Sequence, residues 1–353
     1  MTDQLKQFFE LSESEIENIR NTSIKDRCHP VKRLLYPKDR GERDFQVIVN
    51  TERALRHIKQ HHTQWLRNFK PRLLNIDDYS TSSGALGEIR AFGAILEAGI
   101  SVEPISRNGA DFLVEDNQEK VLIEVHSKQF HDKESESLEK FYNDLRNEIT
   151  KSDRKTGSVI GEHKTAPFGK PEKKDEKVTA NAISKLCAIK QKEHQMNTDY
   201  TSILWLDFQD EVWELLDTVD RVLPVRTWNR AFYSGEFWYA FYGWKDAPIF
   251  EQFRLDTLLN PVVKMGHSGR FRNSTKPTKL DAVIISFSRN TVILENPFSK
   301  KAIQPSLWKK LICLPWFNFE YSYTNWPAMN LIQRIELEEE KLKKLIELSS
   351  IEL

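Results

Sequence analysis

Three ionisable side chains recur at alternate positions in one short stretch of this chain. Residues 121–128 read VLIEVHSK, and their β-branched and apolar content predicts a strand. Successive side chains of a strand point to opposite faces, so Glu124, His126 and Lys128 share one face and the apolar residues between them share the other. Three ionisable residues on one strand face are unusual, which marks this stretch as a candidate site.

A second acidic residue opens the apolar run that comes just before. Residues 109–114 read GADFLV, and the polar segment 115–119 that follows is short enough to be a hairpin loop. The two runs therefore predict an antiparallel pair in which Asp111 and Glu124 lie side by side. Two carboxylates at that distance repel each other, so the arrangement either raises a pKa or binds a divalent metal ion. Oxygen ligands favour Mg²⁺ or Mn²⁺.

These residues resemble the signature of the PD-(D/E)xK nuclease superfamily, in which an Asp opens one strand and Glu-x-Lys closes the next. Asp111 matches the first acid, with Ala110 where the family often has Pro, and Glu124 matches the second acid. His126 stands at the Lys position, and Lys128 lies two residues further along the same face. The resemblance implies a catalytic role for these four ionisable residues. Either His126 or Lys128 takes the part of the family lysine, which orients the attacking hydroxide or stabilises the pentavalent phosphate.

A helix that precedes both strands adds a further carboxylate. Residues 81–98 predict a helix that starts in the TSSG sequence, where a hydroxyl can cap free N–H groups, and that ends at Gly99. Glu88 lies at the edge of its apolar stripe, and we expect Arg90 to be exposed. In the superfamily an acid on this helix often joins the site; the alternative is a boundary glutamate without such a role. The implied ligands of the metal ion are Asp111, Glu124, the Val125 carbonyl and Glu88.

The order of the expected elements also resembles the core of that superfamily. We expect a helix, three strands, a helix and a strand covered on both faces, followed by a strand pair that extends the sheet. The expected ranges are 81–98, 102–105, 112–114, 121–125, 178–196, 201–208, 280–287 and 291–294. The predicted fold class is therefore α/β with α+β elaborations, a mixed sheet flanked by helices and restriction-endonuclease-like.

The remaining segments are expected to surround this core. Residues 1–80 predict a helical N-terminal region, and 81–300 a nuclease-like core with an insertion at about 130–177. Residues 301–353 predict a C-terminal helical extension, whose final charged amphipathic helix either caps the core or mediates self-association.

Composition sets limits on partners and location. Lys plus Arg equals Asp plus Glu at 52 each, so any nucleic-acid binding must rely on local patches and metal rather than on overall charge. The three cysteines are far apart, which argues against disulfides and structural zinc and for a reducing compartment. No stretch approaches the roughly 20 apolar residues of a membrane span. Without a recognisable secretory signal at its start, the chain is expected to be cytoplasmic.

Two segments outside the expected core are candidates for nucleic-acid contact. Residues 257–280 contain no acid, and their basic residues are expected to contact phosphates; the alternative is an exposed loop. Residues 228–244 are dense in aromatic side chains, which either stack bases or fill a mixed core. The basic residues of the first segment are Lys264, Arg270, Arg272, Lys276 and Lys279.

The residues and the resemblance together predict a Mg²⁺-dependent or Mn²⁺-dependent endonuclease that hydrolyses DNA, of a restriction-like or anti-phage defence type. The expected partner is DNA, with a second copy or a subunit of a defence system as further candidates and no membrane. One alternative is a catalytically degenerate nuclease fold that binds nucleic acid or assembles a complex, which the altered Lys position favours. A third is an RNA or single-strand nuclease, which the aromatic segment favours.

Overall fold

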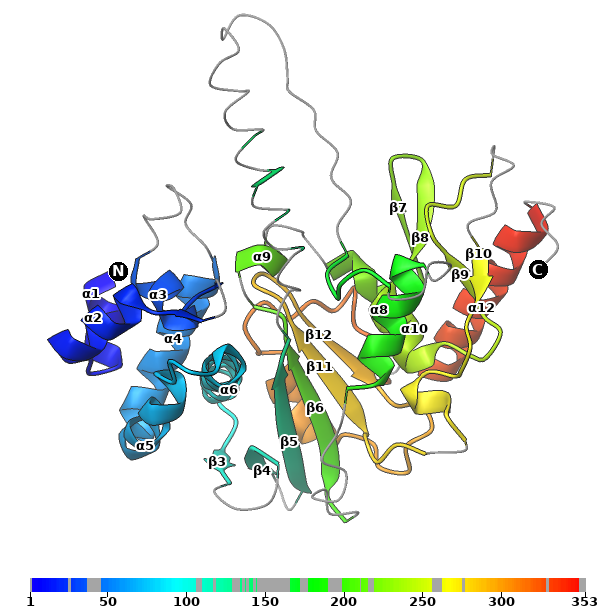
Figure 1. Cartoon of the computed structure of the whole chain (residues 1–353). Helices are drawn as coiled ribbons and strands as arrows, with labels where there is room; N and C mark the ends of the chain where they lie inside the picture. The colour runs from blue at the N-terminus through cyan, green and yellow to red at the C-terminus, as the bar shows by residue number, and fades with distance from the viewer. Residues whose placement is uncertain are drawn as a thin grey trace, which may run out of the picture.

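In a computed structural model, the chain folds as a mixed α/β protein (Figure 1). Most of the predicted insertion, including a charged helix expected at 133–151 and a loop at 152–177, lies outside the residues that the structure describes. The described residues are 2–24, 27–36, 46–105, 110–116, 119–128, 134, 137, 140, 141, 144, 166–171, 177–189, 199–209, 211–214, 219–255, 262–274, 277–327 and 330–348.

Within these residues, the centre of the fold is a six-stranded sheet in the order β12-β11-β6-β5-β4-β3. Its strands are β3 (Val102–Pro104), β4 (Phe112–Asp116), β5 (Glu119–Ser127), β6 (Thr201–Asp207), β11 (Ala282–Ser286) and β12 (Thr291–Glu295). The pairs β5–β6 and β6–β11 are parallel, and the other pairs are antiparallel. The expected hairpin of β4 and β5 and the expected extension by β11 and β12 are both confirmed, so the sheet is mixed as predicted.

Helices cover both faces of the sheet (Figure 1). The helices are α1 (Thr2–Phe8), α2 (Glu13–Asn21), α3 (Pro30–Leu35), α4 (Gln46–His61), α5 (Thr63–Leu73), α6 (Tyr79–Glu97), α8 (Val178–Cys187), α9 (Glu211–Glu214), α10 (Glu236–Tyr242), α11 (Pro305–Leu311) and α12 (Leu331–Leu348). Short ladders and 3₁₀ turns complete the described elements: β1 (Ser23–Ile24), β2 (Arg27–Cys28), β7 (Val225–Trp228), β8 (Ala231–Ser234), β9 (Pro248–Phe250), β10 (Val262–Lys264), η3 (Val219–Val222) and η4 (Arg270–Arg272). None of the described helices has the length and apolar character needed to cross a membrane.

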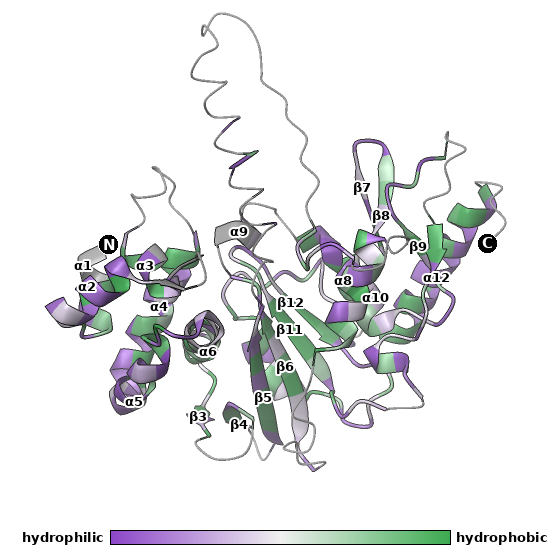
Figure 2. Cartoon of the chain, in the orientation of Figure 1, coloured by the Kyte–Doolittle hydropathy of each residue, from purple (hydrophilic) through white to green (hydrophobic). Residues whose placement is uncertain are grey.

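Two hydrophobic clusters form the core, one on each face of the sheet. Ile203 and Trp205 of β6 point into the cluster shared with α4, α5 and α6, whereas Leu204 and Leu206 point into the cluster shared with α8, α10 and α12. Every residue of β6 is buried, as its continuous apolar run predicts for a strand covered on both faces. Figure 2 shows the apolar character that continues along β11 and β12. The sheet thus has a buried centre, and polar groups must gather at its ends and edges.

Helix α6 begins earlier than the sequence predicts. Its first residue is Tyr79, and the carboxylate of Asp78 caps it by accepting a hydrogen bond from the Ser80 N–H at 3.0 Å. The expected start in the TSSG sequence is therefore inside the first turns. An aspartate is as good an N-cap as a hydroxyl residue, and here it is the aspartate that has the required extended backbone.

Candidate functional site

The β4–β5 hairpin brings Asp111 to the middle of β5. Regular pairing of the two strands extends to Phe112 opposite Ile123. Just before it, the Asp111 N–H donates to the Ile123 carbonyl at 3.0 Å, and the Asp111 carboxylate accepts from the Val125 N–H at 2.7 Å. A side-chain oxygen thus takes the place of a backbone acceptor where the strands separate. Asp111 is held next to Glu124, as the hairpin predicted.

Glu124 and His126 follow each other on one face of β5. The Glu124 side chain is only 3% exposed, whereas the His126 side chain is 39% exposed. His126 Nε2 lies 3.8 Å from Glu124 Oε1, a distance too long for a hydrogen bond and one at which a protonated imidazole would form an ion pair. The strand therefore presents a buried carboxylate with an accessible imidazole above it.

Glu88 on α6 is bound by an arginine that the sequence did not single out. Arg72 near the end of α5 donates to both Glu88 oxygens, with Nη1 to Oε2 at 3.0 Å and Nη2 to Oε1 at 2.6 Å. The hydrogen bonds to Glu88, and then the negative charges of Glu88 and Asp111, raise the pKa of the Arg72 guanidinium against the opposing effect of burial. Arg72 is half exposed and lies within electrostatic reach of both carboxylates. No spacing in the sequence connects it with them.

Lys128 stands just beyond the end of β5 and is partly buried. Its backbone N–H donates to the Asp207 carbonyl at 2.8 Å, which fixes it at the end of β6. Its Nζ lies 6.0 Å from the centre of the Phe168 ring. Burial lowers the pKa of the Lys128 ammonium, and the charge of Lys185 lowers it further. Lys185 on α8 donates to the Phe168 carbonyl at 2.5 Å, so two ammonium groups gather near one aromatic residue.

Lys185 is a second residue that sequence analysis missed. The helix that carries it was predicted, but its apolar spacing gives no reason to connect Lys185 with Lys128 across the segment between them. The connection arises only because α8 packs on the same side of the sheet as the Glu124 face of β5.

A buried ion pair lies on the opposite face, beneath α6. Arg90 Nε and Nη2 donate to the Asp207 carboxylate at 3.2 and 2.5 Å, and both side chains are almost inaccessible, at 5% and 0%. The expectation that Arg90 is exposed was wrong, because α6 is a central helix enclosed between the sheet and the N-terminal helices. Gly87 permits this close approach, since a Cβ there would lie 2.7 Å from the Ser127 Cβ.

The expected ligands of a metal ion are only partly brought together. In the described part of the chain, no three acidic, histidine or cysteine side chains gather as a metal-binding group. Asp111 and Glu124 on neighbouring strands offer the hard oxygen ligands that Mg²⁺ and Mn²⁺ prefer. Glu88 is bound by Arg72 and lies on α6, which packs on the opposite face of the sheet from the Glu124 side chain, so the structure does not gather Glu88 with the other two acids. Two carboxylates, with the nearby Val125 carbonyl, are a minimal set that fits a hydrated divalent ion.

The acid-free basic segment is a packed part of the fold. Phe271 is buried and anchors it between α10 and α12. Arg272 is ion-paired with Glu339 of α12, so its charge is balanced within the protein. Lys276 lies outside the described residues, whereas Lys264 and Lys279 are exposed. Phosphate contact by Lys264, Arg270, Arg272, Lys276 and Lys279 stays a prediction, and the two exposed lysines have the geometry that suits it best.

The aromatic segment divides into two parts. Residues 237–242 lie in α10 and are fully buried, so they fill the core on the α8 side of the sheet. Trp228, at the end of β7, is 66% exposed instead. Most aromatic residues of the segment are therefore core residues. Trp228 is exposed enough to stack on a base.

Comparison of the chain with protein-family models, with curated proteins and with solved structures found no match.

Proposed function

We propose that this protein is a metal-dependent nuclease with a restriction-endonuclease-like core that hydrolyses phosphodiester bonds in DNA, as an enzyme of restriction or anti-phage defence would. The observation that carries the proposal is the position of Asp111. Its carboxylate is bound to the Val125 N–H, beside the buried Glu124, with His126 on the same strand and Lys128 just beyond the strand's end. A mixed sheet between two layers of helices supports the same conclusion.

Asp111, Glu124 and the Val125 carbonyl would hold Mg²⁺ or Mn²⁺. When bound, such an ion lowers the pKa of a coordinated water and offsets charge on the scissile phosphate. Until then, Arg72 balances the charge of Glu88 and Asp111 and limits the repulsion between acidic groups.

Lys128 would supply the positive charge that the site needs. A neutral imidazole offers one donor and one acceptor, so His126 cannot by itself replace an ammonium group that stabilises a phosphorane. The Lys128 ammonium, with Lys185 close to it, provides that charge at the end of β5. His126 is accessible enough to orient a water molecule or to accept its proton.

A second candidate is a nucleic-acid-binding or assembly module that kept the arrangement without the chemistry. The observation that favours it is the ion pair of Glu88 with Arg72, which occupies one of the expected ligands. An RNA or single-strand nuclease is the third candidate, and the exposure of Trp228 favours it over a strictly duplex enzyme.

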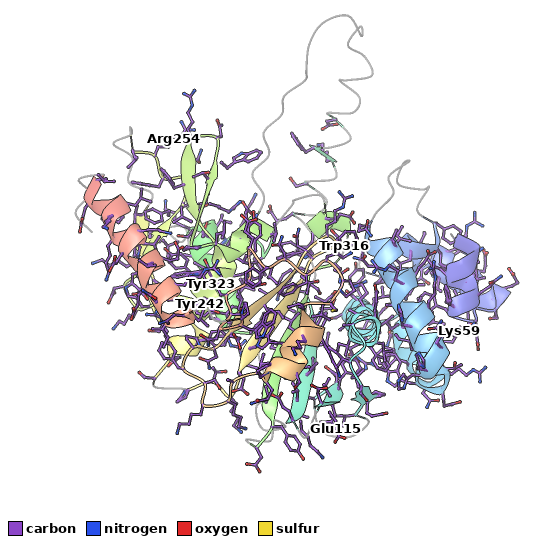
Figure 3. All side chains as sticks on the ribbon, turned by 180° about the vertical axis from the view of Figure 1, so that it is seen from behind. Lys59, Glu115, Tyr242, Arg254, Trp316 and Tyr323 are labelled. Atoms are coloured by element: carbon purple, nitrogen blue, oxygen red, sulfur yellow. The ribbon has the colours of Figure 1, made fainter. Side chains whose placement is uncertain are left out.

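The test is cleavage of duplex DNA, single-stranded DNA and RNA by the purified protein with Mg²⁺ or Mn²⁺, and with chelator. We expect cation-dependent cleavage that is lost in Asp111→Asn and in Glu124→Gln, because each removes a charged ligand without altering the side-chain volume. Glu115→Gln is the matched control, since Glu115 (Figure 3) is an exposed carboxylate of the same hairpin. It pairs with Lys120 at 3.0 Å. Cleavage in chelator, or a fully active Asp111→Asn, would contradict the metal site. A wild type that cuts none of the three substrates would favour the binding module.

A further inference from the structure

Trp228 is an unusually exposed aromatic residue for a chain with so large a core. Its exposed fraction is 66%, whereas every residue of the neighbouring α10 is buried. It stands at the end of β7, in a hairpin with β8 that extends away from the body of the protein (Figure 1). A tryptophan ring that contacts little of its own protein leaves a large, flat apolar surface to a ligand.

The hairpin is built so that this ring stays outside. Trp228 pairs with Ala231, whose side chain is too small to cover an indole ring. The opposite face of the hairpin carries Phe232, which packs on Phe253 with ring centres 6.1 Å apart. Two backbone hydrogen bonds between Phe232 and Phe253, at 2.7 and 3.0 Å, fix this inner face. Because successive residues of a strand point to opposite faces, Phe232 anchors the face of the hairpin that Trp228 does not occupy, and Ala231, which pairs with Trp228, is itself buried.

The turn at the tip is held in one conformation. Asn229 and Arg230 both have positive φ, at 47° and 60°, as in the two-residue turns that match the twist of a hairpin. A left-handed arginine is unfavourable on its own, so the surrounding structure must hold it. Arg254 braces the turn by donating from Nη2 to the Asn229 carbonyl at 3.5 Å, and Figure 3 shows Arg254 at the outer end of the hairpin.

Arginines lie on both sides of the ring. Residues 225–234 contain two arginines and no acid. The Arg226 guanidinium lies over the Tyr233 ring at 5.2 Å, on the same face of the hairpin as Trp228, but it is ion-paired with Asp220 at 3.7 Å. The charge that the hairpin offers to a ligand therefore lies at its tip. Arg230 is exposed at the tip, and Arg254 lies beside it. A rigid aromatic ring among guanidinium groups has the chemistry that single-stranded nucleic acids require, with stacking for a base and charge for the flanking phosphates.

We propose that the β7–β8 hairpin is a base-stacking element for single-stranded nucleic acid, in which Trp228 stacks on an unpaired base while Arg230 and Arg254 contact the neighbouring phosphates. This inference rests on the proposed function and specifies its substrate: a nucleic acid that is single-stranded where it meets the hairpin. The hairpin rises beyond the same end of the sheet as α9, which follows β6, and Lys128 is bound to the end of that strand (Figure 1). A nucleic-acid strand held at the hairpin would therefore lie beyond the end of the sheet at which Lys128 stands.

The surroundings of the ring favour a base over an apolar protein partner. The residues next to Trp228, from Thr227 to Arg230, are all exposed, and the others among them are polar or charged. A protein interface of useful affinity needs a larger continuous apolar patch. A base needs one ring face, and a projecting tip suits a base that has left its stack.

The test is the affinity of the protein for a dye-labelled single-stranded oligonucleotide, measured by fluorescence anisotropy. Chelator is present so that no cleavage occurs. Trp228→Ala should weaken binding on the order of 10-fold, and Trp228→Phe should retain most of the affinity because stacking needs only an aromatic face. Phe298→Ala is the matched control, since Phe298 is 56% exposed and has the Arg272 guanidinium 5.9 Å from its ring. A duplex of the same length should lose little affinity with Trp228→Ala.

The contribution of the two arginines is measured separately, from the salt dependence of the affinity. Arg230→Gln and Arg254→Gln should each reduce the slope of log affinity against log salt by about 0.7 for a single strand. An unchanged affinity of Trp228→Ala, an equal loss for duplex, or no binding of any single strand by the wild type would overturn the hairpin proposal. Binding through Trp228 by a protein that cuts nothing would refute the nuclease alone. Cleavage of single strands by Trp228→Ala at the wild-type rate and affinity would refute the hairpin alone.

Discussion

Helix α6 meets two charged clusters only two residues apart, and they differ in their access to solvent. Arg90 binds Asp207 in a pair whose side chains are 5% and 0% exposed, and Ser286 adds a further hydrogen bond to the carboxylate at 3.3 Å. Glu88 binds Arg72 in a pair whose guanidinium is half exposed and close to Asp111. One helix thus carries two arginine–carboxylate ion pairs in different environments. The closed pair fixes α6 on the sheet, whereas the open pair meets solvent through its guanidinium, since the Arg72 side chain is 50% exposed and the Glu88 side chain 12%.

Removing the arginine from each pair should reduce stability by different amounts. Arg90→Ala leaves Asp207 as a buried charge without its main partner and should reduce the free energy of unfolding by about 3–5 kcal/mol. Arg72→Ala leaves the Glu88 carboxylate, whose side chain is 12% exposed, without its partner, but water can enter the space of the half-exposed guanidinium, so the loss should be smaller, about 1–2 kcal/mol. Urea denaturation of the two variants measures both values. Equal losses would show that the open pair is as structural as the closed one.

Along β5 and just beyond it, Lys128 and His126 should differ in their effect on the rate of cleavage. Lys128→Ala should reduce cleavage on the order of 10²-fold with little loss of binding, because charge stabilisation of the transition state is removed. His126→Lys should preserve or raise activity. Lys120→Ala is the control, since Lys120 is an exposed lysine of the same strand. A silent Lys128→Ala together with an inactive His126→Ala would make histidine the catalytic base.

The lowered pKa of Lys128 predicts how the rate depends on pH. Burial and the charge of Lys185 favour the neutral amine, so Lys128 loses its proton at a lower pH than an ordinary lysine. Cleavage should therefore fall as pH rises through that lowered pKa, and Lys128→Arg should keep its charge and move the fall to higher pH. Over the same interval the unfolded chain still holds the proton, so this group makes the folded state relatively more stable as pH rises. A rate profile that is identical in Lys128→Arg would remove Lys128 from the mechanism.

The smallest effects should come from the basic segment. Lys264→Gln with Lys279→Gln removes exposed charges and should weaken nucleic-acid binding for all sequences, with the salt slope reduced by about one for each lost duplex contact. Arg272→Gln loses its pair with Glu339 and should alter stability more than binding. Binding at several salt concentrations, with thermal unfolding in parallel, distinguishes the two. An unchanged slope in the double variant would leave the segment a packing element.

The sequence could predict what depends on local pattern. The β4–β5 hairpin follows from two apolar runs around a short polar turn, and the burial of β6 on both faces follows from its unbroken apolar run. Arg72, Lys185 and the partner of Arg90 could not be predicted, because their roles depend on how helices pack against distant strands. A count of basic residues could not predict which charges are balanced within the protein. Arg272, for example, pairs with Glu339 on a distant helix.

Thermal and urea unfolding with increasing Mn²⁺ tests the central claim most directly, because it requires no knowledge of the substrate. If Asp111 and Glu124 hold the cation, the wild type and Glu115→Gln should gain about 2.7 kcal/mol of unfolding free energy at a cation concentration one hundred times the dissociation constant. The double variant Asp111→Asn with Glu124→Gln should fold and gain nothing. Equal stabilisation of the double variant, or no stabilisation of the wild type, would contradict a metal site at this pair of carboxylates.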